Sequence, residues 1–379
     1  MTGLLIYGAV NDAHIRLVTH ALQQHENIRC FIYDPWNNVR ATYRCGSHKS
    51  LDPTIWAREI VWHNDEPHFP IQRIELKKDV RAIWLRNKRF IDTIETPQDQ
   101  DKFFSSRENS AFLFGIIPTF NILHFNNITS IHLQRFKILQ LDMAEQAGFR
   151  VPETLISSDK RTIARFAKEA PTIIKPLHTN FIPPTMDGSD SIIVLMTNRV
   201  THTEIRGTPG KSLAAAPSIY QREILKDHEI RLVACGNSAV GYRIESQRSR
   251  LGKLDWRRGQ VEPIFQKMEI AGALKKAAVT YLRLAHLQSG VFDIAVDKEG
   301  RAWFLECNSE GQWAWLEPYW DGPIARMFAR EITHLLQKDP TVQNGKAGVD
   351  HARIRNGEDS RAQRRAPSIR TPIFRARRR

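Results

Sequence analysis

The sequence predicts an α/β protein that begins with an open α/β unit. Leu4–Tyr7 is a short apolar strand candidate, and Cys30–Tyr33 is a second one. Between them, the apolar residues of Asp12–Gln24 recur with the spacing of a helix. Such a β-α-β beginning is typical of an open α/β sheet. Much further along, Ser289–Pro318 predicts two strands joined by a tight turn.

The composition is that of a globular protein. The chain has 379 residues, 41% of them hydrophobic and 25% charged, which suffices for a large core and two or three structural units. The N-terminus lacks the basic region and long apolar run of a signal peptide, and no stretch approaches a membrane span. The four cysteines are scattered without C-x-x-C spacing, which favours reduced thiols. We therefore expect a cytoplasmic protein without a membrane partner.

Much of the net charge of +14 lies near the C-terminus. Lys346–Arg379 contains eleven Lys and Arg against three Asp and Glu, so +8 of the charge falls in this segment. It has almost no apolar periodicity, and we expect residues 341–379 to form a disordered basic tail. A solvated tail and a tail that weakly binds RNA or another polyanion both stay open. Elsewhere we expect no nucleic-acid partner.

The two strands near the C-terminus carry three oxygen-bearing side chains. Val291–Val296 contains Asp293, and Ala302–Asn308 ends in Glu306 and Asn308. Side chains alternate along a strand, so Glu306 and Asn308 share one face. Two carboxylates and an amide oxygen, without sulfur or imidazole, are ligands that suit Mg²⁺. The sequence predicts a magnesium site here, and a solvated hairpin with charges on its outer face is the alternative.

The connecting turn sets the expected pairing of these strands. Its sequence, Asp-Lys-Glu-Gly, is favourable for a tight turn. We expect Val296 to pair with Arg301. Asp293 would then lie opposite Phe304 and diagonal to Glu306. A slip of one residue would break this polar face.

The rest of the chain predicts further strands and helices. His132–Ala147 is expected to be one amphipathic helix ended by Gly148. Its apolar stripe consists of Leu133, Phe136, Leu139, Met143 and Ala147. The other expected strands are Val80–Leu85, Pro171–Pro176, Ser191–Met196, Ser218–Leu225, Glu229–Cys235 and Ser238–Glu245, and the other expected helices are Ala271–Ala285 and Gly322–Leu336.

The pattern D-x-x-x-D…G…F-L-E-x-N…G-Q-W-x-W-x-E resembles the end of an ATP-grasp ligase. Gly311–Glu317 is similar, more specifically, to the graspetide or microviridin maturases, which cross-link ribosomal peptides. The resemblance covers Ser130–Gln337 well and the earlier residues loosely. It implies an N-terminal open α/β (pre-ATP-grasp) domain followed by a two-lobed α+β ATP-grasp fold. The implied boundaries are residues 1–126, 127–217 and 218–340, with the tail at 341–379.

Two lysines resemble the phosphate-binding lysines of this family. Lys137 lies in a segment similar to the N-K-x-x-Q-L element of the maturases, with Phe136 in place of the usual Asn. Lys175 ends an I-I-K-P strand typical of ATP-grasp proteins, and the loop Leu177–Asp190 resembles the one that folds over the phosphates. The resemblance implies that both ammonium groups neutralise phosphates of ATP. Ordinary surface lysines are the alternative.

The segment I-Y-Q-R-E-I-L-K-D-H-E-I-R-L resembles the adenine hinge of ATP-grasp proteins. By that resemblance the backbone around Glu223 and Ile224 holds the adenine edge. Gln221 would assist, and Glu229 would reach the ribose hydroxyls. A plain strand with exposed charges is the alternative.

Two arginines are candidates for binding the reacting group. Arg231 lies between Ile230 and Leu232 on an otherwise apolar strand, where an unpaired guanidinium is costly. Arg257 belongs to D-W-R-R-G, which matches a D-W-R element of the maturases. Guanidinium forks suit carboxylate and phosphoryl oxygens. We expect both to bind the reacting carboxylate or its acyl phosphate, and structural ion pairing is the alternative.

The resemblance implies an enzyme that uses ATP and Mg²⁺ to activate Asp or Glu side chains of a ribosomally made precursor peptide, with a leader and a core. Acceptors would be Ser/Thr hydroxyls or Lys amines, which gives macrocyclic esters or amides. A small-molecule or polyglutamate ligase is the first alternative. A non-catalytic peptide- or RNA-binding protein with a grasp fold is the second. A homodimer stays open.

Overall fold

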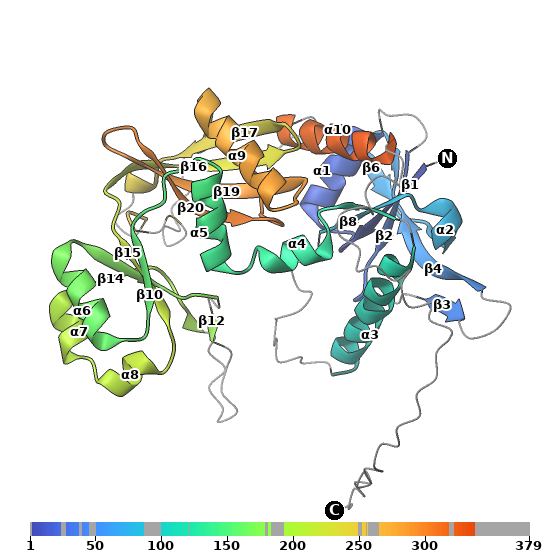
Figure 1. The fold of residues 1–379 in the computed structure, drawn as a ribbon. Helices are drawn as coiled ribbons and strands as arrows, with labels where there is room; N and C mark the ends of the chain where they lie inside the picture. Colours follow the sequence, from blue (N-terminus) through green and yellow to red (C-terminus); the bar gives the residue numbers. More distant parts are fainter. Residues whose placement is uncertain are drawn as a thin grey trace, which may run out of the picture. The chain divides into compact units, whose positions relative to one another are not determined.

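The computed structural model describes residues 2–23, 28–37, 40–44, 51–86, 100–120, 122–178, 181–182, 193–248, 252–254, 256, 265–317 and 322–337. Met1–Pro340 form one compact unit, shown in Figure 1. The expected basic tail and Arg257 lie outside the described residues. Among the described residues, no helix has the length and apolar character needed to cross a membrane.

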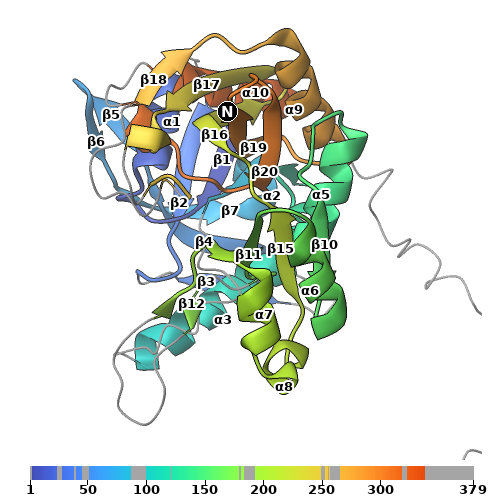
Figure 2. The same ribbon diagram turned by 90° about the vertical axis from the view of Figure 1, so that its left-hand side faces the viewer.

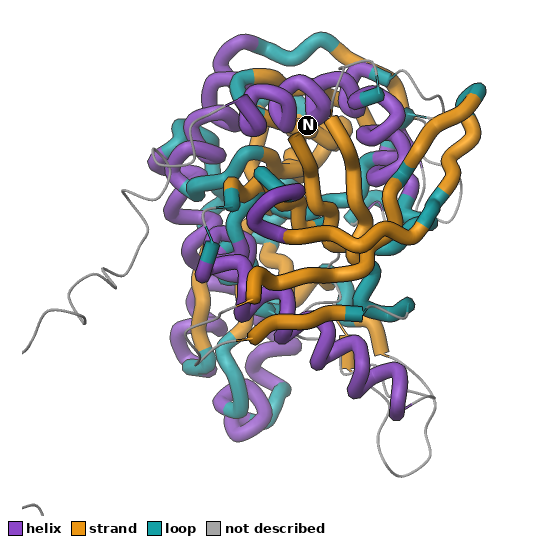
Figure 3. Tube along the Cα trace, turned by 90° about the vertical axis from the view of Figure 1, so that its right-hand side faces the viewer, coloured by secondary structure: helices purple, strands orange, loops and turns teal. Residues whose placement is uncertain are grey.

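The N-terminal sheet has the strand order β3-β4-β2-β1-β8-β9, with β7 paired to β4 (Figure 3). The parallel core is β1 (Thr2–Tyr7), β2 (Ile28–Tyr33), β8 (Ala82–Leu85) and β9 (Leu123–Phe125). Antiparallel β4 (Leu51–Glu59), β3 (Ala41–Arg44) and β7 (Ile71–Glu75) extend it. Helix α1 (Ala13–Leu22) begins at Asp12, whose carboxylate accepts the N–H groups of His14 and Ile15. The β-α-β prediction is confirmed.

Smaller elements complete this part of the chain. They are β5 (Val61–His63) paired with β6 (Glu66–His68), α2 (Leu76–Asp79), α3 (Gln100–Ile116) and α4 (Ile128–Leu133). Asn126, which follows β9, has φ of +59°, and its side chain makes five hydrogen bonds to Gln288, Ser289 and Ser309 around β19 and β20. Its amide therefore fastens the end of the N-terminal sheet to the C-terminal strands.

A four-stranded antiparallel sheet follows, in the order β10-β15-β11-β14. Its strands are β10 (Thr154–Ser157), β15 (Ser218–Arg222), β11 (Thr172–Lys175) and β14 (Asn198–Val200). Helices α6 (Lys160–Glu169), α7 (His202–Gly207) and α8 (Gly210–Ala214) cover one face (Figure 2). Ile174 and Tyr220 pack in the cluster under these helices. Their strand neighbours Ile173, Lys175 and Gln221 line a cavity on the opposite face, as alternation requires.

The C-terminal sheet is antiparallel, in the order β18-β17-β16-β19-β20. Its strands are β16 (Lys226–Cys235), β17 (Ser238–Ile244), β18 (Phe265–Met268), β19 (Ser289–Asp297) and β20 (Ala302–Asn308). Helices α5 (Lys137–Gln146) and α9 (Gly272–Leu284) pack on one face, and α10 (Pro323–Gln337) packs on the other (Figure 1). Helix α10 also lies against α1, which joins this sheet to the N-terminal one.

The face under α10 changes character along its strands. Val233 and Val291 pack in the apolar cluster with α10. Two residues before Val233 on the same face of β16 lies Arg231, and two residues after Val291 on β19 lies Asp293. Both charged residues line the cavity instead. The same face of the sheet is thus apolar where it packs in the cluster with α10 and polar where it forms a wall of the cavity.

Most of the expected strands and helices are confirmed, and the prediction of one helix is wrong. Strands and helices are found close to the expected ranges. Of the strand expected at Ser191–Met196, Ile193–Val194 is a strand, Leu195 and Met196 are not, and the first two residues lie outside the described part of the chain. The single helix expected at His132–Ala147 is instead split into α4 and α5. Phe136 is extended, with φ of −85° and ψ of 107°. The expected stripe is not buried at this point, because Leu133 and Phe136 are 42% and 48% exposed. Gly148 ends α5 with a positive φ as expected.

Candidate active site

Strands β19 and β20 pair in a register that the sequence did not predict. Val296 pairs with Ala302, and Asp293 lies directly opposite Glu306 rather than Phe304. The register shifts between Asp293 and Ile294, so β20 contains one extra residue, Leu305. The expected register was therefore wrong, and a β-bulge replaces it.

The bulge has a packing cause. Ile294 pairs with Phe304, and Phe292 pairs with Cys307; all four side chains lie in one fully buried cluster. Phe292 and Ile294 are two residues apart on β19, whereas Phe304 and Cys307 are three residues apart on β20. Both pairs can face the core only if β20 has one extra residue between Phe304 and Cys307. Without it, Glu306 would be turned toward the core. The bulge therefore lets Phe304 and Cys307 stay buried while Glu306 faces the cavity.

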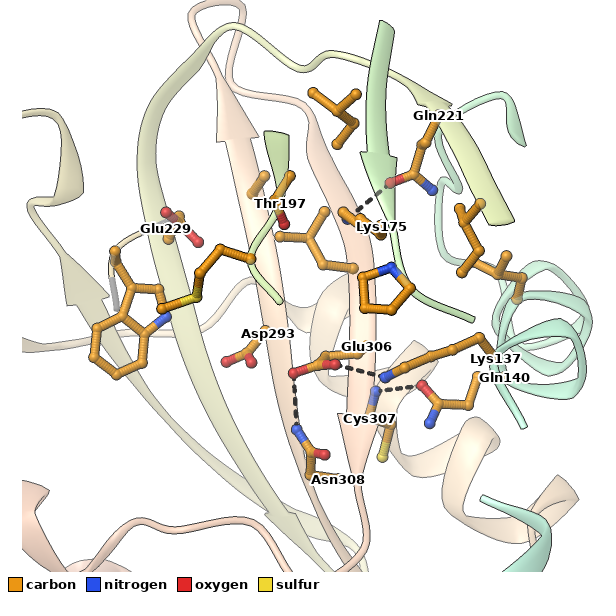
Figure 4. Close-up of a pocket in the computed structure, with 18 of the residues that line it drawn as sticks. Lys137, Gln140, Lys175, Thr197, Gln221, Glu229, Asp293, Glu306, Cys307 and Asn308 are labelled. Atoms are coloured by element: carbon orange, nitrogen blue, oxygen red, sulfur yellow. Dashed lines mark hydrogen bonds and ion pairs between the residues drawn. The ribbon is translucent and has the colours of Figure 1, made fainter. Parts of the chain in front are cut away.

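Glu306 and Asn308 share the cavity face, as predicted, and Cys307 points the other way (Figure 4). The amide nitrogen of Asn308 lies 3.1 Å from Glu306 Oε1. On the other side, Lys137 Nζ lies 2.6 Å from Glu306 Oε2. Lys137 reaches Glu306 because it is the first residue of α5, immediately after the helix break.

Gln140 holds α5 against β20. It is 2% exposed, and its Oε1 accepts the backbone N–H of Cys307 at 3.0 Å. Its Nε2 donates to the carbonyl of Gln134, whose own Oε1 accepts the hydroxyl of Tyr281 at 2.6 Å. This buried network fixes the helix that carries Lys137 on the strand that carries Glu306.

Arg231 and Asp293 form a buried ion pair. Arg231 Nη1 lies 2.5 Å from Asp293 Oδ1, and the two side chains are 6% and 5% exposed. Arg231 Nη2 donates to the carbonyl of Gln312 at 2.8 Å. Its Nε is buried and has no hydrogen-bond partner among the described residues. The structural ion pair weighed for Arg231 is present, and one donor is left over.

Lys175 lies on β11 at the end of the cavity near β15. Its Nζ donates to Gln221 Oε1 at 3.0 Å, and Gln221 Nε2 donates to Thr154 Oγ1 at 2.8 Å. Gln221 therefore orients the ammonium group of Lys175 in the cavity (Figure 4).

Glu223, just after β15, forms an ion pair with Arg199 at 2.6 Å. The backbone N–H of Glu223 donates to the carbonyl of Pro171.

Glu229 is a buried acid on the cavity wall. Its Oε1 lies 2.8 Å from Lys226 Nζ, and the two side chains are 5% and 8% exposed. Burial raises the pKa of Glu229 above its ordinary value, and the nearby Asp293 adds to this, while Lys226 opposes it. Lys226 also donates to the carbonyl of Leu254.

All these groups line one cavity of about 900 Å³, within the roughly 300–1,000 Å³ typical of small-molecule sites. It contains every described residue that the sequence singled out for the site: Lys137, Lys175, Gln221, Glu223, Ile224, Glu229, Arg231, Asp293, Glu306 and Asn308. Arg257 lies outside the described residues. The cavity also contains Gln140, Lys226, Trp256 and Trp315, for which the sequence motifs predicted no role. For Gln140, the family-like K-x-x-Q spacing was an available signal.

The loop after β20 connects the site to the N-terminal sheet. Arg86, which follows β8 and is buried, donates to the carbonyl of Glu310 at 2.8 Å and to Gln312 Oε1 at 3.1 Å. The carbonyl of Gln312 in turn accepts Arg231. Burial lowers the pKa of Arg86, and Asp12, 3.6 Å away, opposes the shift. One glutamine thus links arginines from two sheets.

The same loop also anchors the last helix. Trp313 is 2% exposed, and its backbone N–H donates to His14 Nε2 at 2.9 Å. Glu317 accepts the backbone N–H groups of Ile324 and Ala325, so its carboxylate caps the N-terminus of α10. Burial raises the pKa of Glu317, and these two N–H groups oppose the shift. The G-Q-W-x-W-x-E segment therefore has a largely structural role at Trp313 and Glu317.

The donor set fits a magnesium ion. Within the described part of the chain, no three His, Cys, Asp or Glu side chains come together as a metal cluster. Asp293 and Glu306 are paired across the strands, and Asn308 adds an amide oxygen beside them. Mg²⁺ takes few protein oxygens and completes its shell with water and phosphate. Two carboxylates and one amide at the wall of an open cavity meet that requirement.

Comparisons with protein-family models and with curated protein sequences found no match. Solved structures do match. The Chryseobacterium gregarium RiPP-associated ATP-grasp ligase, in complex with ADP and a leader and core peptide, has a TM-score of 0.69 at 18% identity, over 88% of this chain and 97% of that one. The macrocyclase MdnC from Microcystis aeruginosa MRC, bound with precursor peptide MdnA, has a TM-score of 0.67 at 23% identity, over 88% and 100%.

A third match is the ATP-grasp ligase PsnB, complexed with a precursor variant, Mg and ADP. Its TM-score is 0.62 at 18% identity, over 88% of this chain and 98% of that one. The chain therefore has the fold of an ATP-grasp ligase. Within that fold, it resembles the ligases of ribosomally made peptides over most of its length.

Proposed function

We propose that this protein is an ATP-dependent peptide maturase. It activates Asp or Glu side chains of a ribosomally made precursor peptide and joins them to Ser/Thr hydroxyls or Lys amines. The observation that carries the proposal is the cavity in which Asp293, Glu306 and Asn308 face two lysines from other elements. The structural likeness to ligases solved with leader and core peptides supports a peptide substrate.

The nucleotide would lie between the two sheets that form the cavity. Lys137 and Lys175 enter from different elements and supply positive charge for the phosphates. The adenine would lie against the backbone around Glu223 and Ile224, with Gln221 beside it. Because the N–H of Glu223 is bonded within the protein, its carbonyl and the amide of Ile224 are the groups proposed for the adenine edge. Glu229 would bind the ribose hydroxyls.

Asp293, Glu306 and Asn308 would hold Mg²⁺, which neutralises charge on the transferring phosphoryl group. In the structure each acid is paired with a cation, Asp293 with Arg231 and Glu306 with Lys137. Nucleotide and metal binding would therefore exchange these partners. Lys137 would turn to the phosphates, and Arg231 would offer its guanidinium to the reacting carboxylate or acyl phosphate. Arg257, from the family-like D-W-R element, is proposed for the same task.

The reaction follows from this arrangement. The γ-phosphoryl group passes to a carboxylate oxygen of the peptide, which gives an acyl phosphate and ADP. A hydroxyl or amine of the same peptide then attacks the carbonyl carbon and loses its proton, and phosphate leaves. Positive side chains around the phosphoryl oxygens supply most of the stabilisation that such a transfer needs.

The test uses the full-length protein with ATP, Mg²⁺ and a candidate precursor. Such a precursor would be encoded beside the gene and carry repeated Thr, Ser or Lys residues and acidic residues. We expect ADP and phosphate as products and one water lost from the peptide per ring. Hydroxylamine should trap the activated carboxylate as a hydroxamate. AMP with pyrophosphate, or a modified peptide without loss of water, would contradict the proposal.

A small-molecule or polyglutamate ligase is the second candidate. The D-cycloserine synthetase DcsG shares the fold with a TM-score of 0.51 at 12% identity, over 89% of this chain and 100% of that one. The higher scores of the peptide ligases favour a peptide substrate. Hydroxamate formed from free glutamate but from no peptide would favour the second candidate. A binding protein without catalysis would form none, although the site retains both acids and both lysines.

A further inference from the structure

The two tryptophans of the G-Q-W-x-W-x-E loop have opposite environments. Trp313 is 2% exposed and packs against Phe328 of α10 in the core. Trp315, two residues later, is 42% exposed and lines the cavity. Folding thus explains Trp313 but leaves a large part of the Trp315 ring in water, where an apolar ligand would gain by covering it.

Trp315 belongs to an aromatic cluster. Its ring centroid lies 4.3 Å from that of Phe265 and 6.0 Å from that of Trp256. The rings of Trp256 and Phe265 meet edge to face at 6.0 Å. These three side chains come from separate parts of the chain and are only partly buried. Together they form an apolar surface, of which Trp256 and Trp315 line the cavity.

The cluster lies close to the group proposed to hold the reacting carboxylate. Arg231 donates to the carbonyl of Gln312, and Trp315 follows Gln312 by three residues, which span at most about 11 Å even when extended. A peptide rises roughly 3.3–3.6 Å per residue. A residue about one to three positions from the activated carboxylate would therefore reach the aromatic cluster.

We propose that the Trp256–Phe265–Trp315 cluster is a binding subsite for an aromatic side chain of the peptide substrate, within three positions of the carboxylate that is activated. This inference rests on the proposed function. Aromatic rings stack offset or edge to face on such a surface, and they gain more than an alanine there because they cover more apolar area. The subsite would thereby select which acidic residue of a peptide enters the cavity.

The test uses synthetic acetylated peptide amides, each with one Glu and otherwise Ala, Gly and Ser. Phe is placed one, two or three positions to either side of Glu, and an Ala-only peptide serves as reference. With ATP, Mg²⁺ and hydroxylamine, at least one Phe peptide should give kcat/KM for hydroxamate about tenfold or more above the reference. In Trp315→Ala this preference should fall to within about twofold. Trp315→Phe should retain part of it.

Tyr43→Ala is the matched control, because Tyr43 has the same 42% exposure but does not line the cavity. This variant should keep the full preference. Thermal unfolding and the ADP·Mg²⁺ affinity of Trp315→Ala separate the subsite from other roles. A loss of ADP affinity would assign the ring to the nucleotide and overturn the proposal. The proposal would also be overturned if Trp315→Ala kept the full preference, or if the wild type formed hydroxamate from all the peptides without any preference for Phe.

The proposed function can fail separately. If the wild type forms no hydroxamate from any peptide, saturation-transfer NMR with the ADP·Mg²⁺-loaded protein decides the subsite. Phe protons that contact the wild type but not Trp315→Ala would support the subsite, whereas contact with neither or with both equally would refute it. Binding of ADP itself, measured in the same samples, tests the nucleotide assignment independently.

Discussion

The ammonium group of Lys137 lies 2.6 Å from the carboxylate of Glu306, so the residue proposed to bind phosphate and the residue proposed to bind the metal form an ion pair with each other. Nucleotide without metal would have to detach Lys137 and leave Glu306 beside the phosphates. Metal without nucleotide would detach Glu306 and leave Lys137 unpaired. If both roles hold, the pair would make the binding of nucleotide and of metal mutually dependent.

Glu306→Gln should uncouple them. We expect metal-free ADP to bind about three- to tenfold more tightly than in the wild type, because Lys137 is released from a partly buried ion pair. The gain in ADP affinity on adding Mg²⁺ should be lost, and turnover should be abolished. Calorimetry in EDTA and in Mg²⁺ measures this, and the control is Glu145→Gln, at an exposed position of α5, the helix that carries Lys137. Equal ADP affinity of variant and wild type in EDTA would refute the exchange.

Gln140→Ala should weaken the positioning of Lys137. Loss of a buried hydrogen-bonding side chain leaves the N–H of Cys307 without its acceptor, which costs about 1–3 kcal/mol of the unfolding free energy. We also expect weaker ADP·Mg²⁺ binding. Denaturant titration and calorimetry report the two effects separately. Gln146→Ala, at an exposed position of α5, is the control. Lost stability with unchanged ADP affinity would confine Gln140 to a structural role.

The raised pKa of Glu229 predicts a pH dependence with a definite sign. A group whose pKa is higher in the folded state binds protons more readily when folded. Its favourable contribution is therefore complete below the unfolded pKa, near 4.5, and is lost as the pH rises through the folded value. Relative to Glu229→Gln, the wild type should lose unfolding free energy across this interval. Urea titrations of both proteins at several pH values measure it, and a difference that grows with pH would contradict the assignment.

Glu317 and Gly322 should be coupled energetically. A Cβ at Gly322 would lie 2.2 Å from the carboxyl carbon of Glu317, which caps α10. Gly322→Ala should therefore destabilise the wild type by pushing the cap away. Glu317→Ala should cost about 1–2 kcal/mol as a lost helix cap. In that variant, adding Gly322→Ala should cost much less. A double-mutant cycle by denaturant unfolding gives the coupling, and strictly additive effects would exclude the steric explanation.

Much of the site could be predicted from the sequence because it lies on elements with strong local signals. Alternation alone placed Glu306 and Asn308 on one face, and the cavity confirms that they lie together. The roles proposed for these residues, and the domain boundaries, stay predictions. The register could not be predicted, since the bulge depends on how Phe304 and Cys307 fit a core built from other elements. The helix break at Phe136 could not be predicted, because the sequence does not distinguish an exposed apolar residue from a buried one.

The link from Arg86 through Gln312 to Arg231 bears on how such a protein can be rearranged. Arg86 belongs to the N-terminal sheet, yet its hydrogen bonds shape the loop that holds a cavity residue. The later sheets thus depend on a residue of the N-terminal part, and we expect them to lose this support if they are excised or fused to a different N-terminal domain. A chimaera that exchanges the first hundred residues should retain its site only if the donor supplies an arginine at the same strand end. Any exchange of the N-terminal part would therefore have to preserve the hydrogen bonds that Arg86 makes to the loop.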